Sequence, residues 1–127
     1  MLTILVADDE PNVVELVRVT LEDDRVRVLE ALDGRTALAV AGVFQPELVF
    51  LDVGLPDVSG LEVCRHLRAD PRFALTKIVM LTAAAQVDDV ARGFAAGASQ
   101  YLTKLFSPVG LLGLVEQLLP RAAWLPE

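Results

Sequence analysis

Residues 48–60 read LVFLDVGLPDVSG, an apolar run that ends abruptly on a carboxylate. The first four residues, Leu48–Leu51, are all apolar, as is typical of a strand that is covered on both faces of a parallel sheet. Asp52 follows directly, and the glycines and the proline after it are residues that turn the chain. This segment therefore predicts a buried strand that carries an acidic side chain to the edge of a sheet.

Short apolar segments alternate with longer segments of helical spacing along the rest of the chain. The expected strands are Leu2–Ala7, Arg25–Glu30, Leu48–Leu51, Ile78–Leu81 and Ser99–Leu102. The expected helices are Asn12–Asp23, Gly34–Gly42, Ser59–Ala69, Gln86–Ala96 and Ser107–Leu119. Such alternation predicts five βα units, with right-handed crossovers that build a three-layer α/β/α sandwich around a parallel sheet.

The length and the charge of the chain limit its organisation and its partners. The 127 residues are expected to form one domain, residues 1–120, with residues 121–127 as a tail or the start of a linker. Residues 1–64 hold 13 acids and 4 basic residues, a net −9, whereas residues 65–127 hold 5 acids and 7 basic residues, a net +2. Because no run of basic residues occurs, direct binding of nucleic acid by this chain is not expected.

Membrane insertion and disulfide bonding are not expected either. No apolar run reaches the ~18–20 residues that a membrane-spanning helix needs, and the acidic start MLTILVADDE lacks the basic region of a signal peptide. Cys64 is the single cysteine, so an intrachain disulfide is excluded. These features predict a cytoplasmic setting.

Polar residues follow four of the expected strands. Asp8 and Asp9 follow the first strand, Asp52 the third and Thr82 the fourth, and the fifth leads to Lys104. The carboxyl ends of parallel strands share one edge of the sheet, where ligands bind at the reversal of strand order. We therefore expect the three acids to converge there, with the hydroxyl and the ammonium group facing them.

Three clustered carboxylates repel one another unless a cation joins them. An all-oxygen cluster with open positions suits Mg²⁺, or Mn²⁺ in its place, together with a phosphate. Asp52 would then be a carboxylate nucleophile that attacks phosphorus and carries an aspartyl phosphate. Lys104 and the Thr82 hydroxyl would hold the phosphoryl oxygens.

These residues resemble the receiver domain of two-component response regulators, the family that includes the chemotaxis response regulator. The segments that carry the resemblance are ILVADDEP, LVFLDVGLPDVSGLEVCRHLR, IVMLTA and GASQYLTK, and it extends from about Leu2 to Leu119. It implies a flavodoxin-like fold with strand order 2-1-3-4-5. It also implies a metal site of Asp8, Asp9, Asp52 and the backbone carbonyl of Gly54, a phosphoacceptor at Asp52, the catalytic partners Lys104 and Thr82, and a switch pair of Thr82 and Tyr101.

The resemblance further implies that a histidine kinase or a histidine phosphotransfer protein supplies the phosphoryl group. The domain would catalyse its own phosphotransfer and autodephosphorylation, as a signalling protein rather than a metabolic enzyme. Phosphorylation would change the surface of the fourth helix, the fifth strand and the last helix, which an output partner or a second copy would bind. The last helix is apolar enough that we expect part of it to remain uncovered for such docking.

One departure from the family pattern leaves an alternative open. Leu105 stands where the family usually has a proline after the lysine, so a trans bond and a shifted loop are expected there. The alternative is a degenerate receiver that acts as an interaction module without phosphate. An aspartate-nucleophile phosphatase is disfavoured, because Gly54 stands where such enzymes carry a second acid. A flavodoxin-like cofactor binder is disfavoured too, because ADDEPN after the first strand would repel a phosphate.

Overall fold

A five-stranded parallel sheet in the order β2-β1-β3-β4-β5 forms the middle layer of the molecule. The computed structural model describes residues 1–83, 87–104 and 106–120, with the backbone alone at 87–89. Its strands are β1 (Leu2–Ala7), β2 (Val26–Ala31), β3 (Leu48–Asp52), β4 (Lys77–Thr82) and β5 (Gln100–Thr103). Its helices are α1 (Pro11–Leu21), α2 (Gly34–Phe44), α3 (Gly60–Ala69), α4 (Val87–Ala95) and α5 (Pro108–Leu118).

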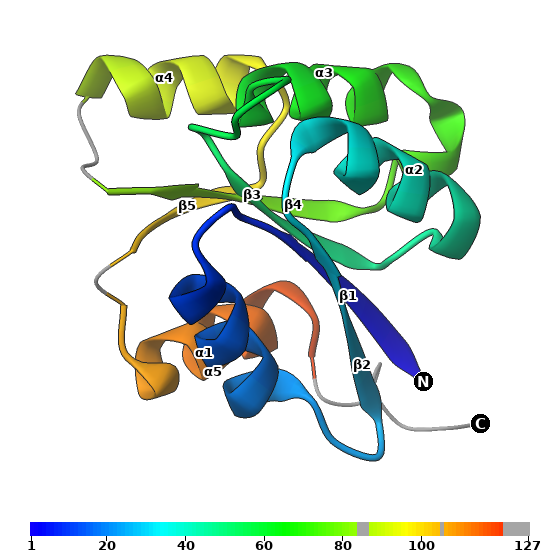
Figure 1. The fold of residues 1–127 in the computed structure, drawn as a ribbon, viewed down its shortest axis with the longest axis vertical. Coiled ribbons are helices and arrows are strands. Elements are labelled where there is room, and N and C mark those ends of the chain that lie inside the picture. Colours follow the sequence, from blue (N-terminus) through cyan, green and yellow to red (C-terminus); the bar gives the residue numbers. More distant parts are fainter. Residues whose placement is uncertain (84–86, 105, 121–127) are drawn as a thin grey trace.

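The helices divide into two layers. Helices α1 and α5 cover one face of the sheet, and α2, α3 and α4 cover the other (Figure 1). The predicted sandwich and the strand order 2-1-3-4-5 are therefore confirmed. No helix in the described part of the chain combines the length and the apolar character needed to cross a bilayer.

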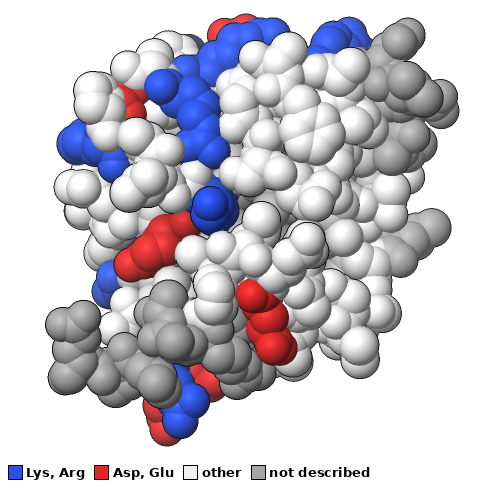
Figure 2. All heavy atoms as spheres, turned by 180° about the vertical axis from the view of Figure 1, so that it is seen from behind, with Lys and Arg blue, Asp and Glu red and all other residues white. Residues whose placement is uncertain are grey.

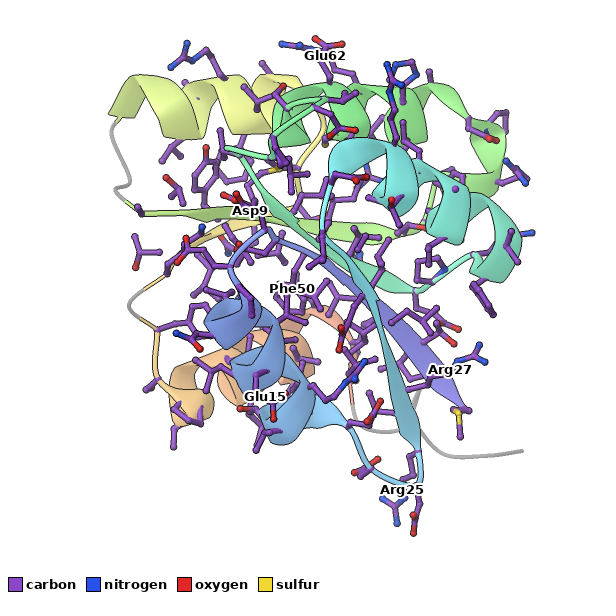
Figure 3. The ribbon with its side chains drawn as sticks, in the orientation of Figure 1. Asp9, Glu15, Arg25, Arg27, Phe50 and Glu62 are labelled. Carbon is purple, nitrogen blue, oxygen red and sulfur yellow. The ribbon has the colours of Figure 1, made fainter. Side chains whose placement is uncertain are left out.

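Each central strand contributes alternate side chains to two separate cores. In β3, Leu48 and Phe50 pack on the α1 and α5 side, while Val49 and Leu51 pack on the α2 and α3 side. Phe50 lies between the sheet and the α1–α5 layer (Figure 3). All five residues of β3 are buried, because helices cover both faces of a parallel sheet. The position of β3 in the middle of the sheet thus explains why residues 48–51 are all apolar.

Most element boundaries differ from the predicted ones by one or two residues, and three of these differences have identifiable reasons. Strands β3 and β4 include Asp52 and Thr82, since the backbone pairing continues past both residues, through Val53 N–H to Leu81 O and Lys104 N–H to Thr82 O. Helix α1 ends at Leu21 rather than at Asp23. The Asp23 carboxylate accepts hydrogen bonds from the next turn and so starts the loop.

Two further segments differ from the sequence prediction. Helix α2 extends to Phe44, two residues beyond the expected Gly42, and ends where Gln45 adopts a left-handed φ of 46°. A short 3₁₀ turn, Pro71–Phe73, follows α3 and is capped by Asp70. The Lys104–Leu105 junction and the tail 121–127 lie outside the described residues, so the expectations for them stay predictions.

The apolar last helix is better covered than expected. Leu111 and Val115 are buried, and Leu112, Leu114 and Leu118 are partly buried against the core beneath α1. Val109, with 83% of its surface exposed, is the one large hydrophobic residue of α5 that is exposed rather than buried or partly buried in the described chain. Uncharged residues also cover most of the face seen in Figure 2, with acidic and basic side chains among them.

Gly60 and Gly113 provide a matched test of how tightly their surroundings are packed. A Cβ on Gly60 would lie 2.2 Å from the carbonyl oxygen of Asp52, whereas a Cβ on Gly113, in α5, meets no atom within 4 Å. We expect Gly60→Ala to lower the free energy of unfolding by about 1–3 kcal/mol through overpacking. Gly113→Ala should raise it by roughly 0.5–1 kcal/mol, because alanine loses less backbone entropy in a helix. Urea unfolding of both variants checks this, and an equal effect of the two would contradict the packing.

Candidate functional site

A pocket of about 440 Å³ opens at the carboxyl edge of the sheet. Its lining residues are Asp9, Glu10, Asp52, Val53, Gly54, Thr82, Ala83 and Lys104. They come from the ends of β1, β3, β4 and β5, whose parallel order brings these ends together. Figure 3 shows Asp9 at this edge, just beyond the end of β1. The predicted convergence of residues at the strand ends is thus observed in the geometry.

Asp8 lies beneath the pocket and is completely buried. One of its oxygens, Oδ1, accepts a hydrogen bond from the backbone N–H of Glu10 at 2.8 Å. The other, Oδ2, has no hydrogen-bond partner among the described residues. Burial raises the pKa of Asp8 and the charge of Asp52 adds to this, while the Glu10 N–H and the Lys104 ammonium act in the opposite direction. The fold therefore disfavours the ionised form of this carboxyl in the absence of a further cation.

Lys104 supplies the cation that the described site contains. Its Nζ lies 3.3 Å from Asp8 Oδ2, 3.3 Å from Asp52 Oδ1 and 2.6 Å from Glu10 Oε1. Burial lowers the pKa of this ammonium, but the Glu10 hydrogen bond and the charges of Asp52 and Asp8 outweigh burial and raise it above its usual value. Lys104 is therefore held protonated, with its side chain only 13% exposed.

The backbone around Asp52 is tightly fixed. Asp52 is 5% exposed, and the Gly54 N–H donates a hydrogen bond to its Oδ1 at 3.1 Å. The Gly60 N–H returns to the Val53 carbonyl at 3.1 Å, so that the loop closes back onto the end of β3. Because a Cβ on Gly60 would overlap the Asp52 carbonyl, only glycine fits there. Asp52 thus faces the pocket from a rigid strand end.

Thr82 and Tyr101 occupy different surroundings. Thr82 is 9% exposed and lines the pocket from the end of β4. Tyr101 does not line the pocket, and its ring packs against α4. The ring centroid lies 6.2 Å from that of Phe94, and a Cβ on Gly93 would come within 2.3 Å of its edge.

The acids that lie closest together are not quite the predicted set. Carboxylate oxygens of Asp8, Asp9 and Glu10 lie within 4.8 Å of one another, and Asp52 is connected to this group through Lys104. An all-oxygen cluster with a buried Asp8 oxygen that accepts no hydrogen bond among the described residues fits a hard divalent cation. Glu10 was not among the residues predicted for this site, and its place directly after Asp9 was the available signal.

Comparisons with known proteins support the same interpretation as the geometry of the pocket. The family described as the response regulator receiver domain matches residues 4–116. The Vibrio cholerae chemotaxis protein CheY4 superposes with a TM-score of 0.88 at 33% identity, covering 94% of this chain and 99% of CheY4. The BeF3-activated DrrB receiver domain superposes with a TM-score of 0.85 at 36% identity, covering 95% of this chain and 99% of that one.

Curated relatives are longer than this chain. The regulator RpaA of Synechocystis is 42% identical over 98% of this chain and 52% of its own length. The regulator PhoP of Bacillus subtilis is 40% identical over 94% of this chain and 49% of its own length. The chain thus spans about half the length of these two relatives. With the family match, the fold and the pocket in agreement, the chain belongs to the receiver domains of two-component response regulators.

Proposed function

We propose that this receiver domain accepts a phosphoryl group on Asp52 from the phosphohistidine of a kinase or a phosphotransfer protein. The observation that carries the proposal is the position of Lys104, whose ammonium lies 3.3 Å from both Asp8 and Asp52 at the pocket edge. A nucleophilic carboxylate beside a fixed cation suits phosphoryl transfer, in which catalysis is mostly positioning and electrostatic stabilisation. This arrangement supports a phosphate-accepting domain over the alternative of a module that works without phosphate.

The transfer needs no separate general base, because an ionised carboxylate is already a nucleophile. An oxygen of Asp52 would form a bond to phosphorus while the bond from phosphorus to the donor nitrogen breaks and its electron pair stays with the donor. Lys104 and Thr82 would bind the phosphoryl oxygens as charge moves onto them. The Gly54 N–H keeps the Asp52 carboxylate oriented toward the pocket during this step.

A divalent cation fits the acidic side of the pocket. Asp8, Asp9, Asp52 and the Gly54 carbonyl would hold Mg²⁺, or Mn²⁺ in its place, with Glu10 beside them. When bound, the ion would neutralise charge on the phosphoryl oxygens. The buried Oδ2 of Asp8 supports this assignment, because it accepts no hydrogen bond among the described residues and its one ion-pair contact, Lys104 Nζ at 3.3 Å, is shared with Asp52.

Phosphorylation would change the surface formed by α4, β5 and α5. Thr82 lies where a new phosphoryl group would bind its hydroxyl, and Tyr101 stands on the neighbouring strand against α4. A movement of Thr82 toward the phosphoryl group would free space for the Tyr101 ring to turn inward, and the surface bound by an output partner or a second copy would change.

Phosphorylation is tested with acetyl phosphate and Mg²⁺, followed by intact mass measurement and peptide mapping. We expect a Mg²⁺-dependent gain of one phosphoryl group that is lost in Asp52→Asn. Lys104→Ala should slow its formation on the order of a hundredfold, as expected for loss of a group that stabilises transition-state charge. Glu15→Gln, which removes an exposed charge from α1 (Figure 3), should leave the rate unchanged. An adduct that persists in Asp52→Asn would refute the assignment.

Asp8→Asn tests the acidic side of the pocket. A carboxyl whose folded pKa exceeds its unfolded value stabilises the fold at low pH and loses that contribution as pH rises through the folded pKa, so ionised Asp8 costs stability at neutral pH. We expect Asp8→Asn to melt a few degrees higher than wild type at pH 7 without divalent cations. Added Mg²⁺ should raise the melting temperature of wild type much more than that of the variant.

The matched control for Asp8→Asn is Asp24→Asn, which removes an exposed acid in the loop before β2. This control measures how much the melting temperature rises simply because the net charge of −7 is reduced. An Asp8→Asn variant that melts lower than wild type and keeps its full response to Mg²⁺ would contradict both the cost of the buried charge and the metal site.

Gly93→Ala tests the contact between Tyr101 and α4. The new methyl group would lie 2.3 Å from the ring edge, so the ring must move away from its present position. We expect altered χ1 couplings of Tyr101 in NMR spectra and a changed rate of adduct formation, because the switch links the ring to Thr82. Gly42→Ala, which meets no atom within 4 Å, is the control. If the ring is displaced but the rate of adduct formation is unchanged, Tyr101 takes no part in the switch.

A further inference from the structure

Asp57, in the loop between β3 and α3, caps a helix that lies far from it in the sequence. The Gly34 N–H donates to its Oδ1 at 2.6 Å, and the Arg35 N–H donates to its Oδ2 at 3.1 Å. These N–H groups belong to the first turn of α2, which has no intrahelical partners for them. The side chain of the ordinary N-cap, Asp33, accepts from Thr36 N–H at 2.7 Å. The start of α2 thus has one local cap and one cap from the phosphoacceptor loop.

Close backbone contact accompanies this cap. A Cβ on Gly34 would lie 2.5 Å from the carbonyl oxygen of Val58, so the loop rests directly on the first residue of α2. Desolvation, the largest single influence, raises the pKa of Asp57, but the backbone N–H groups of Val58, Gly34, Arg35 and Asp57 itself together outweigh it and hold that pKa below its usual value. Asp57 is therefore ionised at neutral pH and remains able to accept both hydrogen bonds.

The capped loop is the one that forms a wall of the pocket. Val53 and Gly54 line the pocket, and the Gly54 N–H contacts Asp52. Both ends of the loop are tied to each other by the bond from Gly60 to Val53. Asp57 lies three residues after Gly54 and supplies the hydrogen bonds that tie the middle of the loop to α2. A displacement at Asp57 therefore has only three residues over which to relax before it reaches the Gly54 backbone.

We propose that Asp57 is a positioning residue, which anchors the loop on α2 so that the Gly54 backbone keeps its orientation toward Asp52 and the metal side of the pocket. This inference rests on the proposed function, in which the Gly54 carbonyl takes part in holding Mg²⁺. Asp57 itself is not among the residues that line the pocket. Its effect is therefore on the geometry of a neighbouring ligand, and such indirect partners commonly govern metal affinity.

Asp57→Ala and Asp33→Ala form a matched pair of variants. Each removes one carboxylate and one cap from the same helix, and only Asp57 stands on the pocket loop. We expect both to lower the melting temperature by a few degrees, as loss of a helix cap does. Only Asp57→Ala should weaken Mg²⁺ binding, on the order of tenfold in calorimetric titration of the folded proteins. Asp57→Asn keeps one acceptor oxygen and should recover part of the affinity.

Amide hydrogen exchange of the Gly54 and Leu55 backbone, measured without divalent cations, reports directly on local opening of the loop. We expect faster exchange there in Asp57→Ala and wild-type exchange in Asp33→Ala. Equal Mg²⁺ affinities for the two alanine variants, or unchanged exchange at Gly54, would reduce Asp57 to a helix cap and overturn the inference. A wild-type domain that binds no Mg²⁺ would instead refute the proposed function, while the exchange measurement would still decide whether Asp57 anchors the loop.

Discussion

The ammonium of Lys104 lies between the carboxylates of Asp8 and Asp52, and the geometry of the pocket depends on this contact. Two acids with 0% and 5% exposure would repel each other strongly in surroundings of low dielectric constant. A single cation offsets that repulsion and is itself kept protonated by it. Because removing ions from water is costly, such a cluster is not a source of stability. The proposed phosphoryl transfer at the sheet edge gives this cluster a role other than stability.

Parallel topology is what makes this cluster possible. Asp8, Asp52 and Lys104 follow or end β1, β3 and β5, and every crossover helix returns the chain to the opposite edge before the next strand begins. The site residues are therefore separated widely in the sequence but gather at one edge. Their scaffold is rigid, since β1 and β3 lie in the middle of the sheet and are buried on both faces. Precise placement of the clustered side chains follows from this rigidity.

The sequence predicted most of the fold because the decisive patterns are local. An apolar run such as Leu48–Leu51 and the acid that follows it identify a strand and its carboxyl end without knowledge of the rest. The ion pair of Glu10 with Lys104 and the cap that Asp57 provides for α2 join residues 94 and 22–23 positions apart. No periodicity connects such residues, so these contacts required the structure. The end of α2 was also missed, because the turn at Gln45 depends on a left-handed residue other than glycine.

The loop from Val53 to Ser59 is an irregular segment beside the sheet that several separate hydrogen bonds hold in place. An irregular loop has no ladder of backbone pairs, so its order must come from individual hydrogen bonds. Here those bonds are distributed: Gly54 ties the start of the loop to Asp52 of β3, Gly60 closes the end of the loop onto Val53, and Asp57 ties its middle to α2. Helix α2 is in turn packed on the sheet through its buried alanines. The position of the Gly54 backbone therefore depends on the packing of α2, so core substitutions on that side of the sheet can alter the chemistry of the pocket without contacting it.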